Sequence, residues 1–213
     1  MGVMKKTTHF PYYWFLISLV VAAVLVVSVR AGDKYQTDVD QLAPLLHWQQ
    51  GSVVADVGAG EGQMTRAVAK IIGPTGRLYA TELDTNRLAR LKEIAAKEKN
   101  VTALEAGVAQ TNLPPACCDS IFMRLVYHHL TKPAEVDASL LQSLKPGGLL
   151  AVIDEEPQPG TKPPAGVPEN RIGHGVPEKI VIEELTATGF QVVKTFEEWP
   201  DKHYCVIFRK PGA

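Results

Sequence analysis

The sequence predicts an α/β domain with one seven-stranded sheet whose last strand is antiparallel, preceded by one N-terminal hydrophobic helix. From residue 52 onward, short apolar runs alternate with segments in which apolar residues recur at helical spacing, which is typical of parallel strands joined by helical crossovers. The last two apolar runs, residues 190–196 and 203–209, are too close together for such a crossover, so they should pair antiparallel. One continuous apolar segment, residues 10–29, precedes all of these elements.

Length and charge indicate the number of domains and argue against a nucleic-acid partner. At 213 residues, the chain is long enough for one α/β domain and one additional segment. Its formal net charge of −1 gives no overall field that attracts nucleic acid, and the sequence has no block of lysine or arginine that could follow a phosphate backbone. We therefore expect no nucleic-acid partner.

The N-terminal segment, residues 1–32, is predicted to be a transmembrane anchor or a secretion signal, and residues 33–213 are predicted to form the domain. At about 1.5 Å per residue, the apolar run 10–29 is long enough to cross a bilayer, and it is apolar on all faces, unlike most core helices. A retained anchor is favoured over a signal that is cleaved near Ala31, because the apolar region of a secretion signal is usually shorter.

Flanking charges and cysteine usage bear on which side of the membrane the domain faces. Lys5 and Lys6 before the apolar run are nearly balanced by Arg30 and Lys34 after it, so the positive-inside rule does not decide. The 3 cysteines are an odd number and include one vicinal pair, which does not resemble a secreted disulfide framework. A cytosol-facing domain is therefore favoured, with export after cleavage as the alternative.

The individual elements follow in order from these patterns. The predicted helices have apolar residues three or four positions apart; they are residues 38–48, 64–72, 86–97, 134–144 and 177–188, the last with Pro177 as its first residue. The predicted strands are short apolar runs, residues 52–56, 77–82, 101–105, 119–125, 149–153, 190–196 and 203–209.

A proline-rich segment, residues 155–175, interrupts the alternation after the fifth predicted strand. Proline removes backbone donors and breaks helices, so this segment should have no regular structure. Loops of this length are usually functional or disordered. Because it follows the carboxyl end of a strand, we expect it to lie over the crevice where open α/β sheets bind ligands.

The stretch VVADVGAGEGQMT, residues 53–65, is the first candidate for a binding site. It reads as a strand, a glycine turn and the start of a helix. Glycines allow positive φ and close approach of a ligand to the backbone, and the first N–H groups of the helix have no partner within the helix. The spacing departs from the dinucleotide pattern Gly-x-Gly-x-x-Gly because Gln63 occupies the third glycine position.

The pattern Asp56-x-Gly58-x-Gly60-x-Gly62 instead resembles the first motif of the class I S-adenosylmethionine (SAM) dependent methyltransferases. The stretches CDSIFMRLVYHHL, residues 118–130, and LLQSLKPGGLLAVID, residues 140–154, are similar to later segments of that family. The resemblance covers about residues 40–210 and implies a Rossmann-like fold, SAM as the cofactor and methyl transfer as the activity.

The resemblance also places the cofactor. The glycine motif would hold the methionine part, and Glu82 at the end of the second strand would bind the ribose hydroxyls, although it could instead cap the next helix. Many relatives have Gly-Asp where this chain has Gly107-Val108, so adenine would be held by backbone groups and apolar contacts. The residues predicted to bind cofactor are Asp56, Gly58, Ala59, Gly60, Gly62, Glu82, Leu83, Val108 and Arg124.

The candidates for a proton-accepting residue lie in two places. Tyr127, His128 and His129 follow the fourth predicted strand, and His174 lies between two glycines in the proline-rich segment. A neutral imidazole can accept a proton near pH 7, so our hypothesis is that His174 or His128 is the base. Local packing of the histidine pair and a merely solvated loop histidine stay open as alternatives.

No metal site is predicted as the main interpretation. The vicinal pair Cys117 and Cys118 precedes the fourth predicted strand, where it should be buried. Binding of a soft metal or metalloid by this pair is the alternative.

The acceptor of the methyl group is predicted only by class. A membrane-anchored domain suits a small-molecule or lipid-soluble acceptor, and the resemblance extends loosely to ubiquinone and menaquinone C-methyltransferases; small thiols or metalloids also fit. A SAM-binding sensor or scaffold without transferase activity is the alternative from another class. An NAD-dependent oxidoreductase is opposed by Gln63.

Overall fold

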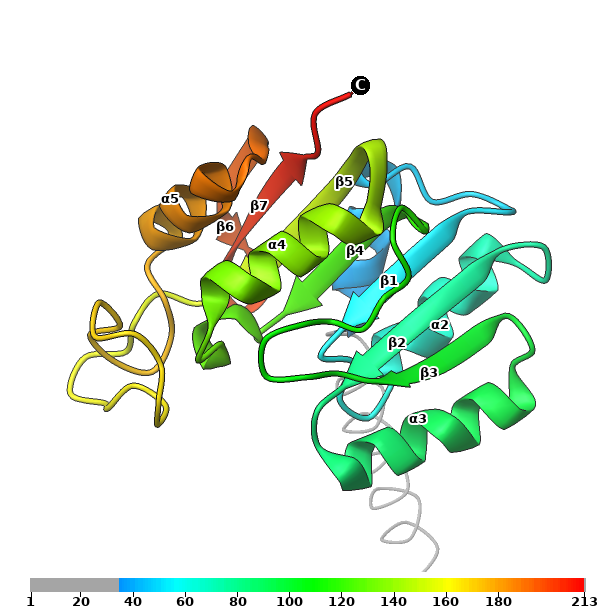
Figure 1. The fold of residues 1–213 in the computed structure, drawn as a ribbon, viewed down its shortest axis with the longest axis horizontal. Coiled ribbons are helices and arrows are strands. Elements are labelled where there is room, and N and C mark those ends of the chain that lie inside the picture. Colours follow the sequence, from blue (N-terminus) through cyan, green and yellow to red (C-terminus); the bar gives the residue numbers. More distant parts are fainter. Residues whose placement is uncertain (1–34, 213) are drawn as a thin grey trace, which may run out of the picture. The chain divides into compact units, whose positions relative to one another are not determined.

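The computed structural model describes residues 35–212, which form one seven-stranded sheet with strand order β3-β2-β1-β4-β5-β7-β6 and helices on both faces (Figure 1). The strands are β1 (Val53–Val57), β2 (Arg77–Glu82), β3 (Val101–Glu105), β4 (Cys118–Arg124), β5 (Leu144–Asp154), β6 (Gln191–Trp199) and β7 (His203–Arg209). The helices are α2 (Gln63–Ile72), α3 (Thr85–Lys97), α4 (Pro133–Ser143) and α5 (Glu178–Thr188), with short 3₁₀ helices η1 (Tyr127–His129) and η2 (Pro200–Lys202). Residues 35–45 are also helical.

The pairing of the strands agrees with the prediction. Strands β1 to β5 are parallel, and β7 is antiparallel to both of its neighbours, β5 and β6. The sheet reverses its strand order between β1 and β4, because the chain goes outward through β2 and β3 and then returns to the other side of β1. In open α/β sheets, ligands bind at the carboxyl ends of the strands at such a reversal.

Some predicted boundaries were wrong, for local reasons. Strand β5 begins at Leu144 and not at residue 149, because Leu144 already pairs with Cys118 before a register shift in the β4–β5 pairing. Pro177 is the residue before α5 and not its first helical residue, because its ψ of 135° is extended. The prediction that β6 ends at residue 196 was also wrong, because the strand continues to Trp199, which pairs with His203.

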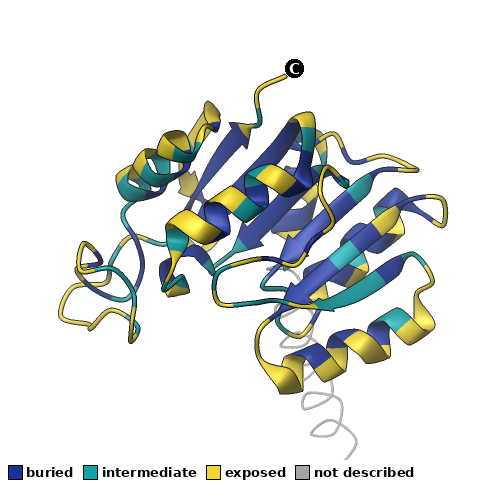
Figure 2. Ribbon diagram, viewed as in Figure 1, coloured by how far each residue is buried: buried dark blue, intermediate teal, exposed yellow. Residues whose placement is uncertain are grey.

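Two apolar layers, one on each face, hold the sheet between its helices. On one face the sheet packs against residues 35–45, α2 and α3, through side chains such as Leu42, Val68 and Leu91. On the other face it packs against α4 and α5, through side chains such as Leu140 and Leu185. Figure 2 shows the result: the central strands are buried, and the outer sides of the helices are exposed.

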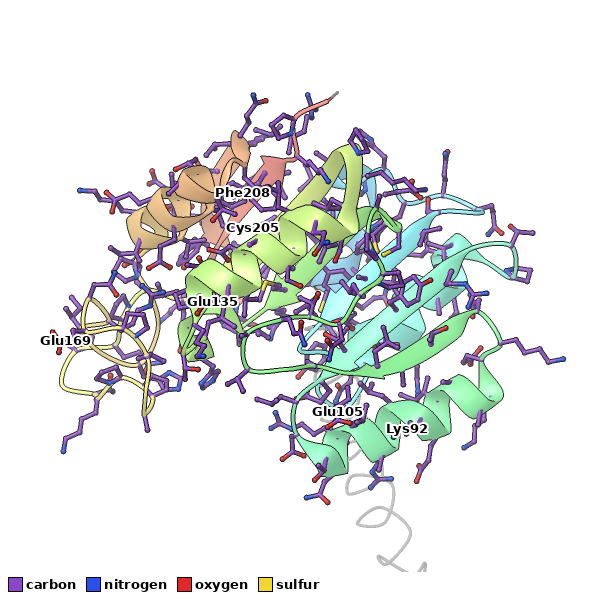
Figure 3. The ribbon with its side chains drawn as sticks, in the orientation of Figure 1. Lys92, Glu105, Glu135, Glu169, Cys205 and Phe208 are labelled. Atoms are coloured by element: carbon purple, nitrogen blue, oxygen red, sulfur yellow. The ribbon has the colours of Figure 1, made fainter. Side chains whose placement is uncertain are left out.

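Strand β7 shows how alternation divides its side chains between these layers. Cys205 belongs to the layer with α2 and α3, and Phe208 belongs to the layer with α4 and α5; both are labelled in Figure 3. Successive side chains of a strand point to opposite faces, so a strand covered on both sides is apolar throughout. All seven residues of β7 except Arg209 are buried.

The connection between β5 and α5, residues 155–177, has no helix and no strand, as its prolines predict. It extends beyond the end of the sheet (yellow in Figure 1), and its Glu169 is labelled in Figure 3. Arg171 ties it to α5: one guanidinium nitrogen donates to Glu184 Oε2 over 2.8 Å and the other donates to Glu184 Oε1 over 3.0 Å. The Arg171 side chain is fully buried, so this pair fixes the loop to the domain.

The predicted hydrophobic helix of residues 10–29 lies outside the described residues. Within residues 35–212, no helix is long and apolar enough to cross a membrane.

Candidate active site

A cavity of about 660 Å³ opens at the carboxyl ends of β1, β2 and β4. Its walls come from the glycine turn, the end of β2, the segment after β3 and the segment after β4. This volume lies in the range of about 300–1,000 Å³ that is usual for small-molecule sites. The cavity therefore lies where the strand order predicts a ligand.

The glycine turn exposes its backbone to this cavity. Gly58, Gly60 and Gly62 have φ of 72°, 56° and 75°, which favour glycine. A Cβ atom would lie 2.4 Å from Val126 at Gly58 and 2.4 Å from Ile94 at Gly62, whereas at Gly60 it would meet nothing within 4 Å. Packing thus requires glycine at the first and third positions, and the middle position leaves room for a ligand against the main chain.

The start of α2 adds unpaired donors to the same wall. Gly62 precedes the helix without a side-chain cap, and the first turn carries no acidic residue. The first N–H groups of a helix and its dipole attract a carboxylate or another anion. This end of the cavity can therefore hold an amino-acid carboxylate.

Glu82 is the acid that joins the glycine turn to the second strand. Its Oε2 accepts from the backbone N–H of Gly60 over 2.9 Å, and its Oε1 accepts from the N–H groups of Leu83 and Asp84 over 2.8 and 3.0 Å. The cap of α3 is Asp84, which accepts from the N–H groups of Asn86 and Arg87, so Glu82 is not needed as a cap. Its carboxylate lines the cavity, and Oε2, which accepts one of these three hydrogen bonds, has a lone pair left for one hydroxyl group.

Asp56 lies beneath the glycine turn at the end of β1. It is 4 % exposed and accepts a hydrogen bond of 2.7 Å from the hydroxyl of Thr65. Burial, with a smaller contribution from the nearby Glu82, raises the pKa of Asp56 to about 7, although hydrogen bonds from Thr65 oppose the shift. A cationic ammonium bound beside it would favour the ionised carboxylate.

Two apolar side chains line the opposite wall. Leu83 is 54 % exposed and Val108 is 56 % exposed, and both border the cavity. Large apolar side chains with this exposure at a cavity wall provide a contact surface for a flat aromatic ring.

Arg124 borders the cavity, but its charge is directed elsewhere. Its Nε donates to Asp38 Oδ2 in a short hydrogen bond, and its guanidinium lies 5.0 Å from the centre of the Tyr35 ring. Trp199 Nε1 donates to the other oxygen of Asp38 over 2.7 Å. The predicted role of Arg124 in cofactor binding therefore competes with a structural role, in which it ties β4 to the helical residues 35–45.

Three of the four predicted acid–base candidates lie together. The ring centroid of His128 is 4.0 Å from that of His129 and 4.7 Å from that of His174. Of these three, only His129 lines the cavity directly. Partial burial, together with the charges of His128 and His174, lowers the pKa of His129 below its usual value.

The fourth candidate, Tyr127, lies in the core. It is fully buried, and its hydroxyl donates to Asp137 over 2.8 Å and lies 3.0 Å from Glu184. Burial and these two carboxyl groups raise its pKa far above the usual range. Tyr127 does not line the cavity.

Comparisons with known proteins identify this arrangement. A family model described as a methyltransferase domain matches residues 55–152. A ubiquinone/menaquinone biosynthesis C-methyltransferase of Stutzerimonas stutzeri is 25 % identical over 165 residues, and one of Saccharophagus degradans is 27 % identical over 165 residues; each match covers 70 % of this chain. The matches span 64 % and 66 % of the length of these relatives.

A solved structure extends the comparison over most of the chain. A SAM-dependent methyltransferase from Aquifex aeolicus superimposes with a TM-score of 0.69 and 26 % identity, covering 82 % of this chain and 90 % of that protein. The fold of residues 35–212 is similar to that of class I SAM-dependent methyltransferases. The predicted sheet is confirmed, and these similarities support SAM as the cofactor.

The cavity of this domain fits SAM. Glu82 can accept from a ribose hydroxyl, the N-terminus of α2 and Asp56 can take the carboxylate and the ammonium of the methionine part, and Leu83 and Val108 can contact the adenine. The open space above Gly60 is the clearest observation, since a side chain there would occupy ligand space. All predicted cofactor residues except Gly62 border the cavity, and Gly62 instead packs against α3.

Sequence reasoning missed two carboxylates beside this cavity. Asp154, at the end of β5, holds His128, and Glu155 contacts His174. The sequence contained one signal, because an acid at the carboxyl end of a central strand faces the ligand edge of the sheet. The pair Cys117 and Cys118 are free thiols, and Cys118 is buried in the core.

Proposed function

We propose that this protein transfers a methyl group from SAM to a small lipid-soluble acceptor, and that a carbon of a quinol-like ring is the methylated atom. The observation that carries the proposal is that one cavity is lined both by the groups that fit the cofactor and by apolar side chains with His129. Val126, Leu130 and Val136 are among these apolar side chains. The names of the relatives from Stutzerimonas stutzeri and Saccharophagus degradans support a quinone-type acceptor.

The chemistry requires alignment and removal of one proton. When bound, SAM supplies a methyl group already activated on its sulfonium. A bond forms between this methyl carbon and the acceptor carbon while the S–CH₃ bond breaks, and the acceptor loses one proton to restore its aromatic ring. The residues of the chain must therefore hold the acceptor in line with the S–CH₃ bond, exclude water and accept that proton.

The histidine cluster is the proposed proton acceptor. Because the Asp154 carboxylate accepts from His128 Nδ1 over 2.7 Å, the lone pair of His128 lies on Nε2. His174 is held in the same way by Glu155, over 3.1 Å. A double variant, His128→Ala with His174→Ala, should lose turnover, and unchanged turnover would exclude both as the base.

We also propose that residues 10–29 form a single-pass anchor with the domain facing the cytosol. This location would bring the cavity close to lipid-soluble acceptors and to cytosolic SAM. The test is fractionation of cells that express the full chain, with protease access from each side. Release after cleavage near Ala31 is the outcome that would contradict the anchor.

The first test of the proposed function measures ligand binding by the full chain in detergent. S-adenosylhomocysteine, the product of SAM, should raise the melting temperature by roughly 5–10 °C at 100 times its dissociation constant, equivalent to about 2.7 kcal/mol, and NAD should not. Turnover with SAM and a short-chain quinol then tests the transfer itself. Binding of the product without turnover on quinols, lipids or thiols would favour a non-catalytic SAM-binding protein.

A further inference from the structure

Three imidazoles converge at the edge of the cavity from two distant segments of the chain. His128 and His129 lie in η1, directly after β4, and His174 lies in the loop between β5 and α5. One ring nitrogen from each of the three lies within 4.8 Å of the other two. Three imidazoles this close together repel one another when they are protonated, so the arrangement suits their neutral forms.

His128 is oriented as metal-binding histidines are. Its Nδ1 donates to Asp154 Oδ1 over 2.7 Å, while its backbone N–H donates to the other oxygen of the same carboxylate over 3.2 Å. The side chain is 1 % exposed, and its Nε2 is buried without a hydrogen-bond partner. An unpaired buried nitrogen is unfavourable, and a carboxylate that fixes the distal ring nitrogen is typical of the histidine ligands of metals.

His174 is held beside the His128 ring by its own loop. Its backbone carbonyl accepts from Gln158 over 2.8 Å, and its backbone N–H donates to Thr161 Oγ1 over 2.8 Å. Its Nδ1 lies 3.1 Å from the Glu155 carboxylate, which leaves Nε2 as the other ring nitrogen that can bind a ligand. Two of the three imidazoles therefore have a carboxylate on the outer side of the ring.

We propose that His128, His129 and His174 bind one transition-metal ion of the zinc class. Nitrogen ligands favour Zn²⁺ and its neighbours over Mg²⁺ or Ca²⁺, which prefer oxygen. Zinc binds imidazole at about 2.0–2.1 Å, so tetrahedral ligand nitrogens lie about 3.4 Å apart, and binding would draw the three rings inward by small side-chain rotations. Three protein ligands leave a coordination position for water or for an acceptor oxygen.

The catalytic role of this metal site rests on the proposed function, because the ion would act on the methyl acceptor. His129 borders the cavity, so the ion would lie at the acceptor end. There it would promote loss of the proton of an acceptor hydroxyl by lowering the pKa of that hydroxyl. The carboxylates of Asp154 and Glu155 would balance part of the charge of the ion.

The test measures metal binding without cofactor or acceptor, so that it does not depend on methyl transfer. The full chain, purified without a histidine tag and freed of metal by a chelator, is titrated with Zn²⁺ by calorimetry and with Co²⁺ by visible absorption. One ion per chain is expected. Asp154→Asn should weaken Zn²⁺ binding by about 10–100-fold, and His129→Ala or His174→Ala should weaken it by more.

His47→Asn is the matched control, because His47 is an exposed histidine outside the cluster with a left-handed φ of 56° that asparagine tolerates. It should bind Zn²⁺ as the unchanged chain does. The proposal is overturned if the unchanged chain binds no ion at micromolar Zn²⁺, or if the double variant His129→Ala with His174→Ala binds equally well. S-adenosylhomocysteine binding by each variant shows separately whether the cofactor site is intact.

Discussion

The two ends of the cavity are built in different ways. The cofactor end comes from one continuous stretch, β1, α2 and β2, and its contacts run mainly through backbone groups: the glycine turn, the start of α2 and the N–H groups that hold Glu82. The histidine end brings together η1, the end of β5 and the loop 155–177, and its contacts run through side chains. A backbone site is encoded locally, whereas a side-chain site depends on how distant segments pack.

The largest expected effect is the loss of stability when the buried ion pair between the loop and α5 is broken. Arg171→Leu leaves the Glu184 carboxylate without its positively charged partner. Loss of one member of a buried pair costs about 3–5 kcal/mol, so the melting temperature should fall by roughly 10 °C or more. Calorimetry of the full chain provides the measurement.

The control for this variant is Lys179→Leu, which removes the exposed pair of Lys179 with Glu183 on the same helix. Exposed pairs contribute about 0–1 kcal/mol, so its melting temperature should barely change. Equal effects of the two substitutions would show that the loop is not held by Arg171.

Glu82→Gln should damage the cofactor end alone. The amide keeps the size of the side chain, but its NH₂ group faces backbone N–H groups that donate to the carboxylate in the unchanged chain. It also lacks the negative charge that would accept from the ribose. Affinity for S-adenosylhomocysteine should fall about 100-fold, equivalent to about 3 kcal/mol, while Zn²⁺ binding stays unchanged. Glu93→Gln, an exposed position on α3, is the control, and similar affinities of the two variants would refute the ribose role.

The pH dependence of stability tests the buried polar groups beneath the histidine end. Burial raises the pKa of Asp137 to about 7, above the value of about 3.9 in an unfolded chain, so the folded state binds more protons between these values. The contribution of Asp137 to the free energy of unfolding is therefore fully present below about pH 4 and is lost as the pH rises through about 7. The free energy of unfolding of Asp137→Asn, relative to that of the unchanged chain, should rise by about 2 kcal/mol between pH 5 and pH 8. Urea unfolding provides the measurement. A constant difference between the two chains over this range would contradict the raised pKa.

The smallest expected effect concerns the positioning of His128. Asp154→Asn keeps a hydrogen-bond acceptor for the ring but removes the carboxylate that orients it. Turnover should fall about 10-fold, and affinity for S-adenosylhomocysteine should stay within about twofold. A matched loss of cofactor affinity would mean that Asp154 supports the cofactor end instead.

The sequence alone determined the sheet and the cofactor end. Strands β2, β3 and β7 have the predicted bounds because each is a short apolar run between turn residues. The glycine turn and Glu82 were predicted because positive φ and an acid at the end of a strand are properties of single positions in one βαβ unit.

Only the tertiary structure decided which candidate side chains meet. Neighbours in η1 point in different directions, so Tyr127 lies in the core beside Asp137 while His129 borders the cavity, and no periodicity in the sequence separates them. His174 reaches His128 because Arg171 is buried against α5, far along the chain from η1. The physical reason is that a loop side chain takes its direction from long-range packing and from charges that pair across the fold, which local sequence does not encode.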